Sequence, residues 1–232
     1  MGNDFDAEAE LSTKKPKKSG FRDTSRRLRQ GKENHLAHRA SLDWRLDHAR
    51  VCAPISETPE VTDLQELRDL VLKSRTGAAL LEESGIEICY DAQTPHAQLY
   101  PRGKSCVITL NPHRPKGDLT NMLTRELRRA WQHRHGALVN PMSFEPDEAV
   151  LVNRAQQADA LMVSIKIAWE LRLIGESEAW DFMAGSPMVD MTRVFEVHAQ
   201  KDFRSLNNGD AARAAYDKFF EGRRTKAHDK AI

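Results

Sequence analysis

The residues with the most distinctive chemical spacing lie in LTRELRRAWQHRHG, residues 123–136. Arg125, Glu126 and Arg129 occupy positions i, i+1 and i+4, and a helix places residues four apart on one face. In a His-Glu-x-x-His helix, this spacing lets two imidazoles bind Zn²⁺ while the glutamate acts on a metal-bound water. Here the glutamate is present, but an arginine stands at each histidine position. Because a guanidinium stays protonated and offers no lone pair, it cannot serve as a zinc ligand.

Two other interpretations of this segment stay open. The first is an ordinary charged helix face, in which Glu126 pairs with Arg129 at i, i+3. The second is a shifted metal site made by Glu126, His133 and Asp159, since His133 lies one turn beyond Arg129. Histidines near a helix end also interact with the terminal carbonyl groups, which argues against the shifted site.

These residues require a helix to carry them, and the pattern predicts one from Leu119 to His135. An apolar stripe recurs at helical spacing on its inner side. Asp118 can cap the helix at its start, and Gly136 ends it. The stripe consists of Leu119, Leu123, Leu127, Ala130 and Trp131.

The flanking sequence predicts a small sheet and several more helices. IEICYD and SCVITL read as strands, residues 86–91 and 105–110, while TPHAQLYPRGK between them reads as a turn region. A long helix over 147–173 has its own apolar stripe from Leu151 to Leu173, including Trp169. The other predicted helices are 63–83, 177–184, 187–204 and 211–220. This order predicts a predominantly helical α+β fold in which a small sheet or hairpin packs against helices.

Positive charge is concentrated near the N-terminus, although the whole chain of 232 residues has a formal net charge of only +1. Residues 14–39 are rich in Lys and Arg and poor in large apolar side chains. We therefore predict a disordered basic arm at 1–40, a linker at 41–62, one domain at 63–222 and a basic tail at 223–232. The arm could contact a polyanion or an acidic protein through residues 14–39.

The remaining composition points to a cytoplasmic protein. Three cysteines, Cys52, Cys89 and Cys106, form no Cys-x-x-Cys pair, and this pattern is typical of a reducing compartment. Cys89 and Cys106 fall on neighbouring predicted strands, where buried thiols are the usual finding. We expect no membrane contact, because no apolar run approaches the length of a membrane span.

ITLNP at 108–112, followed by ELR at 126–128 and AWQ at 130–132, resembles a bacterial family of zincin-like metallopeptidases of unknown function. Members carry His-Glu-Leu-Arg-His-Ala-Trp-Gln after a strand ending in Leu-Asn-Pro. A later helix carries an acidic Glu-Ala-Asp-Ala-like stretch, which is QADA at 157–160 here. The resemblance implies a zincin-like fold, with Glu126 at the base position and Arg125 and Arg129 at the histidine positions. It places Asp159, or less favourably Gln157, at the third ligand position.

The function we expect is therefore that of a metallopeptidase-like protein without zinc or catalysis, acting in binding or regulation and needing no cofactor. One alternative is an active metallopeptidase with a rearranged zinc site that uses Glu126. Another is a nucleic-acid-associated protein that acts through its basic arm. We also expect Arg125 or Arg129 to pair with Asp159 or Glu126 between the two helices, in place of a metal.

Overall fold

Three strands form a mixed sheet whose inner face is built from aliphatic residues. The computed structural model describes residues 61–83, 86–103 and 105–221, and all of them belong to one compact unit. The strands are β1 (Ile86–Tyr90), β2 (Ala97–Arg102) and β3 (Ser105–Leu110). Their order is β1-β3-β2, with β1 parallel and β2 antiparallel to the central β3. The observed fold is α+β and mostly helical, as predicted.

Strand β2 corrects the sequence prediction, which treated this segment as a turn. It contains Pro101 and few β-branched residues, so its local signal for a strand is weak. An edge strand tolerates proline because one side of its backbone needs no partner. Leu99 aligns with Ile108 of β3, which in turn aligns with Ile88 of β1, so three buried side chains cross the sheet in one row.

The predicted helix over 63–83 is in fact two helices, α3 (Leu64–Leu72) and α4 (Arg75–Glu82). Ser74 separates them and caps α4 by accepting a hydrogen bond from the Gly77 backbone N–H at 3.0 Å. Its hydroxyl also donates to the carboxylate of Glu170 on a distant helix, at 2.6 Å. The prediction of one helix missed this break, although serine is a residue type that favours a helix N-cap.

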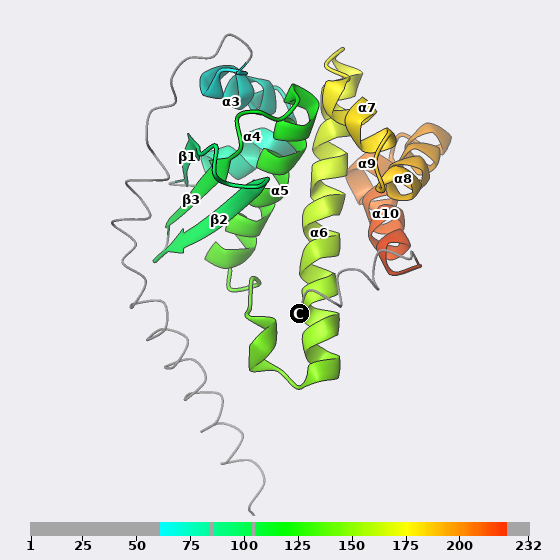
Figure 1. Cartoon of the computed structure of the whole chain (residues 1–232). Helices are drawn as coiled ribbons and strands as arrows, with labels where there is room; N and C mark the ends of the chain where they lie inside the picture. Colours follow the sequence, from blue (N-terminus) through cyan, green and yellow to red (C-terminus); the bar gives the residue numbers. More distant parts are fainter. Residues whose placement is uncertain (1–60, 84–85, 104, 222–232) are drawn as a thin grey trace, which may run out of the picture. The chain divides into compact units, whose positions relative to one another are not determined.

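The two longest helices, α5 (Lys116–Arg134) and α6 (Pro146–Leu173), form an antiparallel pair joined by a loop and the short 3-10 helix η1 (Pro141–Ser143) (Figure 1). α5 begins earlier than predicted, after Pro115. Asp118 therefore lies inside its first turn and makes no cap hydrogen bond. The predicted inner stripe of α5 is buried apart from Trp131, which is half-buried.

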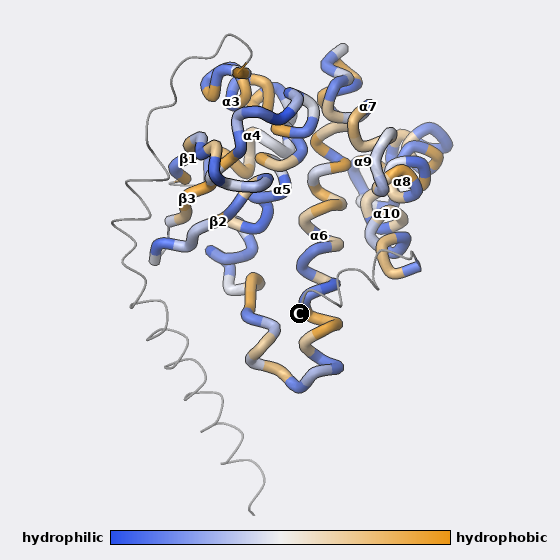
Figure 2. The backbone as a smooth tube through the Cα atoms, in the orientation of Figure 1, coloured by the Kyte–Doolittle hydropathy of each residue, from blue (hydrophilic) through white to orange (hydrophobic). Residues whose placement is uncertain are grey.

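α6 lies between two separate hydrophobic cores, so it is buried on more than one side. Hydrophobic segments recur along its length (Figure 2). One core joins α6 to α3, α4, α5 and the sheet, and the other joins it to the C-terminal helices through Trp169, Trp180 and Phe195. Leu151 and Leu173, at the two ends of the predicted stripe, are exposed instead.

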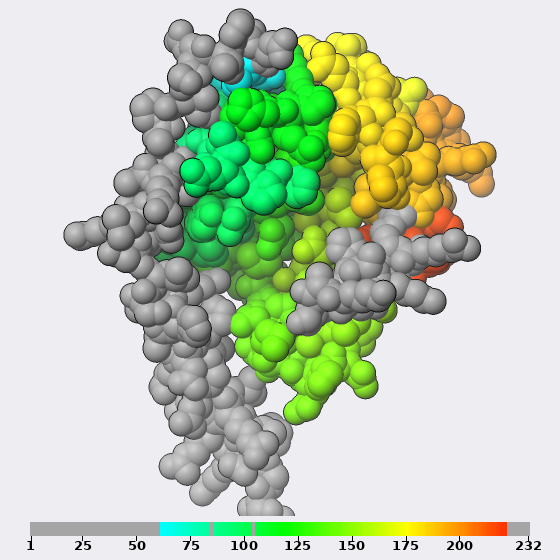
Figure 3. All heavy atoms as spheres, viewed as in Figure 1, coloured from blue at the N-terminus to red at the C-terminus, as the bar shows by residue number. Residues whose placement is uncertain are grey.

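The C-terminal part contains α7 (Glu178–Ala184), α8 (Val189–Lys201), α9 (Ser205–Asn208) and α10 (Asp210–Glu221). The predicted helix 187–204 ends at Lys201, since Asp202 adopts an extended backbone. Figure 3 shows α7 and α8, in yellow to orange, beside the green surface of the strands and α5. Among the described helices, none combines the length and hydropathy needed to cross a membrane.

Candidate functional site

Glu126 is fully buried on α5 and is held by two arginines of the same helix. Arg125 donates from Nε to Oε1 at 3.1 Å, and Arg129 donates from an η nitrogen to Oε2 at 3.0 Å. The glutamate side chain has no exposed surface, whereas the side chains of Arg125 and Arg129 are 32% and 31% exposed. Both carboxylate oxygens are thus engaged, and the two guanidiniums lie between the glutamate and the solvent.

Asp159 on α6 makes a different set of contacts from the one expected. Arg128 donates to it twice, from Nε to Oδ2 at 2.7 Å and from an η nitrogen to Oδ1 at 3.0 Å. Gln132 donates to Oδ2 at 2.7 Å and to the backbone oxygen of Gln156 at 3.1 Å. The expected arginine–glutamate contact exists, but it lies within α5. The contact between the helices is made by Arg128, which the sequence analysis did not single out.

The AWQ segment, residues 130–132, contributes to this contact region between α5 and α6. The Arg128 guanidinium lies 3.9 Å from the centre of the Trp131 ring, which is a cation–π distance. The Trp131 ring also stacks on His135, with centroids 4.1 Å apart. Gln132 is buried, and it can reach Asp159 because it lies one turn beyond Arg128 on the helix. Arg128 and Gln132 therefore join α5 to α6, and Trp131 packs against the Arg128 guanidinium.

The LNP segment also has a local structural role, at the end of β3. Asn111 donates from Nδ2 to the backbone oxygen of Thr94 at 2.9 Å and accepts from the His113 N–H at 3.0 Å. These bonds shape the loop that leads from the sheet into α5.

Residues 41–229 match the family described as "Putative metallopeptidase family (DUF6782)". The chain belongs to that family. No curated protein matches it, and no solved structure does. Membership covers most of the chain and supports a metallopeptidase-like protein. Which chemistry this member performs depends on the side chains present at its own site.

The side chains of this family member do not fit a zinc ion. The positions spaced for two imidazoles hold Arg125 and Arg129, which carry positive charge and no free lone pair. Within residues 61–83, 86–103 and 105–221, no three His, Cys, Asp or Glu side chains are grouped to hold a metal. His133 is hydrogen-bonded through Nε2 to the backbone oxygen of Gly103, at 3.1 Å, in the turn between β2 and β3. Gln157 is half-buried on α6.

Asp118 adds a second buried carboxylate on the same helix. Arg114 lies 3.1 Å from it through Nε, four residues earlier, and donates from an η nitrogen to Nδ1 of His96 at 2.8 Å when His96 carries its proton on Nε2. Burial raises the pKa of Asp118, while the charges of Arg114, His96 and Arg125 act to lower it. The i, i+4 spacing of Arg114 and Asp118 is visible in the sequence and is typical of an ion pair on a helix. The contact between Arg114 and His96 is not visible there, because the two residues are 18 positions apart.

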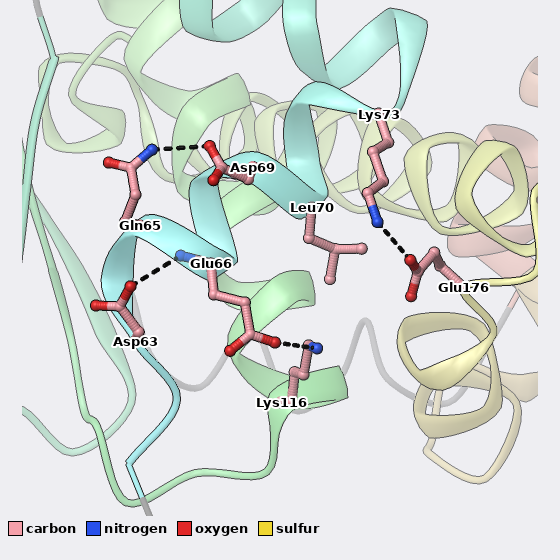
Figure 4. Close-up of a pocket in the computed structure, with 8 residues that line it drawn as sticks. All are labelled: Asp63, Gln65, Glu66, Asp69, Leu70, Lys73, Lys116 and Glu176. Carbon is pink, nitrogen blue, oxygen red and sulfur yellow. Dashed lines mark hydrogen bonds and ion pairs between the residues drawn. The ribbon is translucent and has the colours of Figure 1, made fainter.

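A separate cavity of about 370 Å³ lies at the start of α3 (Figure 4). Its charged residues pair with one another across it. Lys116 binds Glu66 at 2.5 Å, and Lys73 binds Glu176 at 2.6 Å. Asp63 caps α3. Because these charges are already satisfied, the cavity has fewer features of a binding site than the arginine pair on α5.

The described cysteines lie on opposite faces of the sheet. Cys106 aligns with Ile86 and shares the face of Ile108, whereas Cys89 aligns with Thr109, three positions along β3. Cys106 is buried as predicted, whereas Cys89 is only half-buried and donates from Sγ to the Ile108 backbone oxygen at 3.8 Å. Burial raises the pKa of the Cys106 thiol, and this favours its uncharged form. The predicted arm at 1–40, the tail at 223–232 and all of the predicted linker except residues 61 and 62 lie outside the described residues.

Proposed function

We propose that this protein is a metallopeptidase-like binding module that does not hold zinc and does not hydrolyse peptides. The observation that carries the proposal is the pairing of Arg125 and Arg129 with the buried Glu126. Two guanidiniums occupy the positions from which a metal would be held, and their charge repels a cation. Their charge also compensates the glutamate, which would otherwise be a costly buried anion.

The environment of Glu126 argues against its use as a general base. A base must come within hydrogen-bond distance of the proton it removes. Glu126 has no exposed side-chain surface, and each of its oxygens already accepts a bond from an arginine. The alternative of a rearranged zinc site with Glu126 and His133 would require both residues to leave their present partners.

Asp159, the residue expected at the third ligand position, is already engaged. It is held by Arg128 and Gln132 between the two helices. Gln157 lies two residues away, about 200° around α6, so it faces away from the side of α6 that Asp159 turns toward α5. We infer that Arg125 and Arg129 stand at the two histidine positions of a metal site, and that its third position is taken up by the contact between the helices.

Elemental analysis of the purified full chain tests the proposal. We expect zinc far below one equivalent after incubation with zinc and removal of excess metal, and no peptide hydrolysis that depends on Glu126. The control for hydrolysis is Glu126→Gln, which keeps the shape of the side chain. One equivalent of bound zinc that is lost in Glu126→Gln combined with Asp159→Asn would overturn the proposal.

The nucleic-acid alternative rests on residues 14–39, which lie outside the described residues. DNA binding by the full chain that weakens steeply with salt and disappears on removal of residues 1–40 would favour it. DNA binding that survives this truncation would show that the nucleic-acid contact does not depend on residues 1–40.

A further inference from the structure

We propose that Arg125 and Arg129 bind an oxoanion, either a carboxylate or a phosphate, at the surface of α5. This inference rests on the proposed function, because it requires that no metal occupies the site. It adds the chemical class of the ligand, which the pairing with Glu126 alone does not specify. The evidence is the number of hydrogen-bond donors left free on these two side chains, their exposure and the balance of charge around them.

Most donors of the two guanidiniums are not used. A guanidinium carries five N–H groups, and Arg125 and Arg129 each give one to Glu126. Among the described residues, neither arginine has a further hydrogen-bond partner. About a third of each side chain is exposed, so a ligand can approach both residues from the solvent. The same two side chains are therefore held firmly on the inside and open on the outside.

The charges at this site leave an excess of positive charge. Two guanidiniums share the single carboxylate of Glu126. Asp118, which the charge of Arg125 also influences, has a cation of its own in Arg114, at 3.1 Å. Because Glu126 is buried while the arginines are partly exposed, an approaching molecule meets the positive groups first. This arrangement attracts an anion and disfavours a metal cation.

Glu126 also orients the arginines before any ligand arrives. A flexible arginine loses rotamer freedom when it binds a ligand, and that loss weakens binding. Here the bonds to Glu126 already restrict both side chains. A guanidinium binds carboxylate or phosphate oxygens through two parallel hydrogen bonds, and a lysine ammonium lacks that geometry. Two such groups side by side suit a ligand with at least two oxygens.

Arg128, on the same helix, makes a different set of contacts. It donates through Nε and an η nitrogen to both oxygens of Asp159, and its face lies over Trp131. Its groups serve the junction between α5 and α6. Arg128 thus connects two helices, whereas Arg125 and Arg129 keep their hydrogen bonds within α5 and are more exposed.

Calorimetric titration of the zinc-free full chain, at constant ionic strength, tests the inference. One arm uses inorganic phosphate. The other uses an acetylated dipeptide with a free terminal carboxylate, with the same dipeptide amide as its control. We expect one saturable site in at least one arm, and the arm that binds identifies the source of the oxoanion. Absence of saturable binding in both arms would overturn the inference.

Single variants locate the site without leaving the buried glutamate unpaired. Arg125→Gln keeps Arg129 on Glu126, and Arg129→Gln keeps Arg125. Each should weaken binding about tenfold, which corresponds to about 1.4 kcal/mol. Arg193→Gln removes the same charge from an exposed position on α8 and should bind like the unmodified chain. Equal binding by all three variants would overturn the inference.

Lysine variants separate a specific site from a general charge effect. Arg125→Lys and Arg129→Lys keep the charge and can still pair with Glu126, but they lack the two-pronged geometry. They should also bind more weakly, and wild-type affinity in both would overturn the inference. Zinc is measured on the same samples. A zinc-free chain that binds neither probe leaves the proposed function standing, whereas one equivalent of zinc removes the proposed function itself.

Discussion

Arg128 and Asp159 connect α5 to α6 through a two-pronged ion pair, with nitrogen–oxygen distances of 2.7 and 3.0 Å. Gln132 donates to the same carboxylate. The aspartate that the sequence offered as a metal ligand therefore belongs to the packing of two long helices. Only about a fifth of each of these two side chains is exposed, so the pair lies between the exposed and the buried extremes.

Removing either partner should lower the free energy of unfolding. Asp159→Asn and Arg128→Gln should each cost about 1–3 kcal/mol, because the remaining partner loses its counter-charge in a half-buried place. A double-mutant cycle in urea should give a clear coupling energy. The matched control is Arg172–Glu196, an ion pair between α6 and α8 at 2.7 Å that is more exposed. Its coupling should stay below about 1 kcal/mol, and equal coupling in the two pairs would contradict this account.

Zinc binding should be recoverable if the arginine site descends from a metal site. Arg125→His with Arg129→His restores two imidazoles at i and i+4, and Arg128→Gln frees Asp159 to act as an acidic third ligand. We expect the triple variant to bind one equivalent of zinc more tightly than the double variant, measured by competition with a chelator. Asp159→Asn added to the triple variant should lower that zinc affinity.

Two outcomes of that experiment would contradict the prediction. No zinc affinity in the triple variant would mean that these three positions never converge on one point. Unchanged zinc affinity on adding Asp159→Asn would show that Asp159 is not the third ligand.

Gly117 should not tolerate a side chain, because α7 lies directly against it. A Cβ atom at this position would press on the backbone oxygen of Glu178 and lie 2.8 Å from its carbonyl carbon. We expect Gly117→Ala to cost about 1–3 kcal/mol in urea unfolding, despite the better helix propensity of alanine. Gly185→Ala is the control, since its nearest atom would be 3.5 Å away. A neutral effect at Gly117 would indicate that α5 and α7 separate easily.

Tyr90 should make stability fall at high pH. Burial, with the charges of Asp63 and Glu66, raises the pKa of Tyr90 to about 12. An unfolded tyrosine ionises near pH 10, so between about pH 10 and 12 the unfolded chain binds fewer protons and becomes favoured. Its hydroxyl donates to the Thr62 backbone oxygen at 2.7 Å, so Tyr90→Phe should be less stable below pH 10.

The stability difference between the wild type and Tyr90→Phe should then narrow as the pH rises above 10. Urea unfolding of both proteins at several pH values measures it, and phenolate absorbance follows the ionisation directly. Curves that stay parallel from pH 9 to 11 would show that Tyr90 ionises normally in the folded protein.

Much of the fold was predictable because its signals are local. The periodicity of Leu119, Leu123 and Leu127 predicted α5, and the β-branched run of β3 predicted the central strand. Strand β2 was missed because an edge strand is specified largely by its pairing with β3, which lies beyond the reach of a local pattern. The break between α3 and α4 was missed because Ser74 acts there partly through Glu170, far along the chain.

For the candidate site, the sequence by itself determined which chemistry is possible. Arginine at positions 125 and 129 removes the lone pairs that zinc needs, and this follows from residue type alone. The segments ELR at 126–128 and AWQ at 130–132 also indicated a metallopeptidase-like family, and the family match confirms this.

Only the tertiary structure decided which charges meet. Arg125, Arg128 and Arg129 are equivalent as letters, yet two of them cover Glu126 while the third crosses to Asp159. Their positions around α5 give them different directions, and the antiparallel packing of α6 determines which direction finds a carboxylate. Spacing along one helix cannot supply that information, because the position of the second helix depends on packing across both hydrophobic cores.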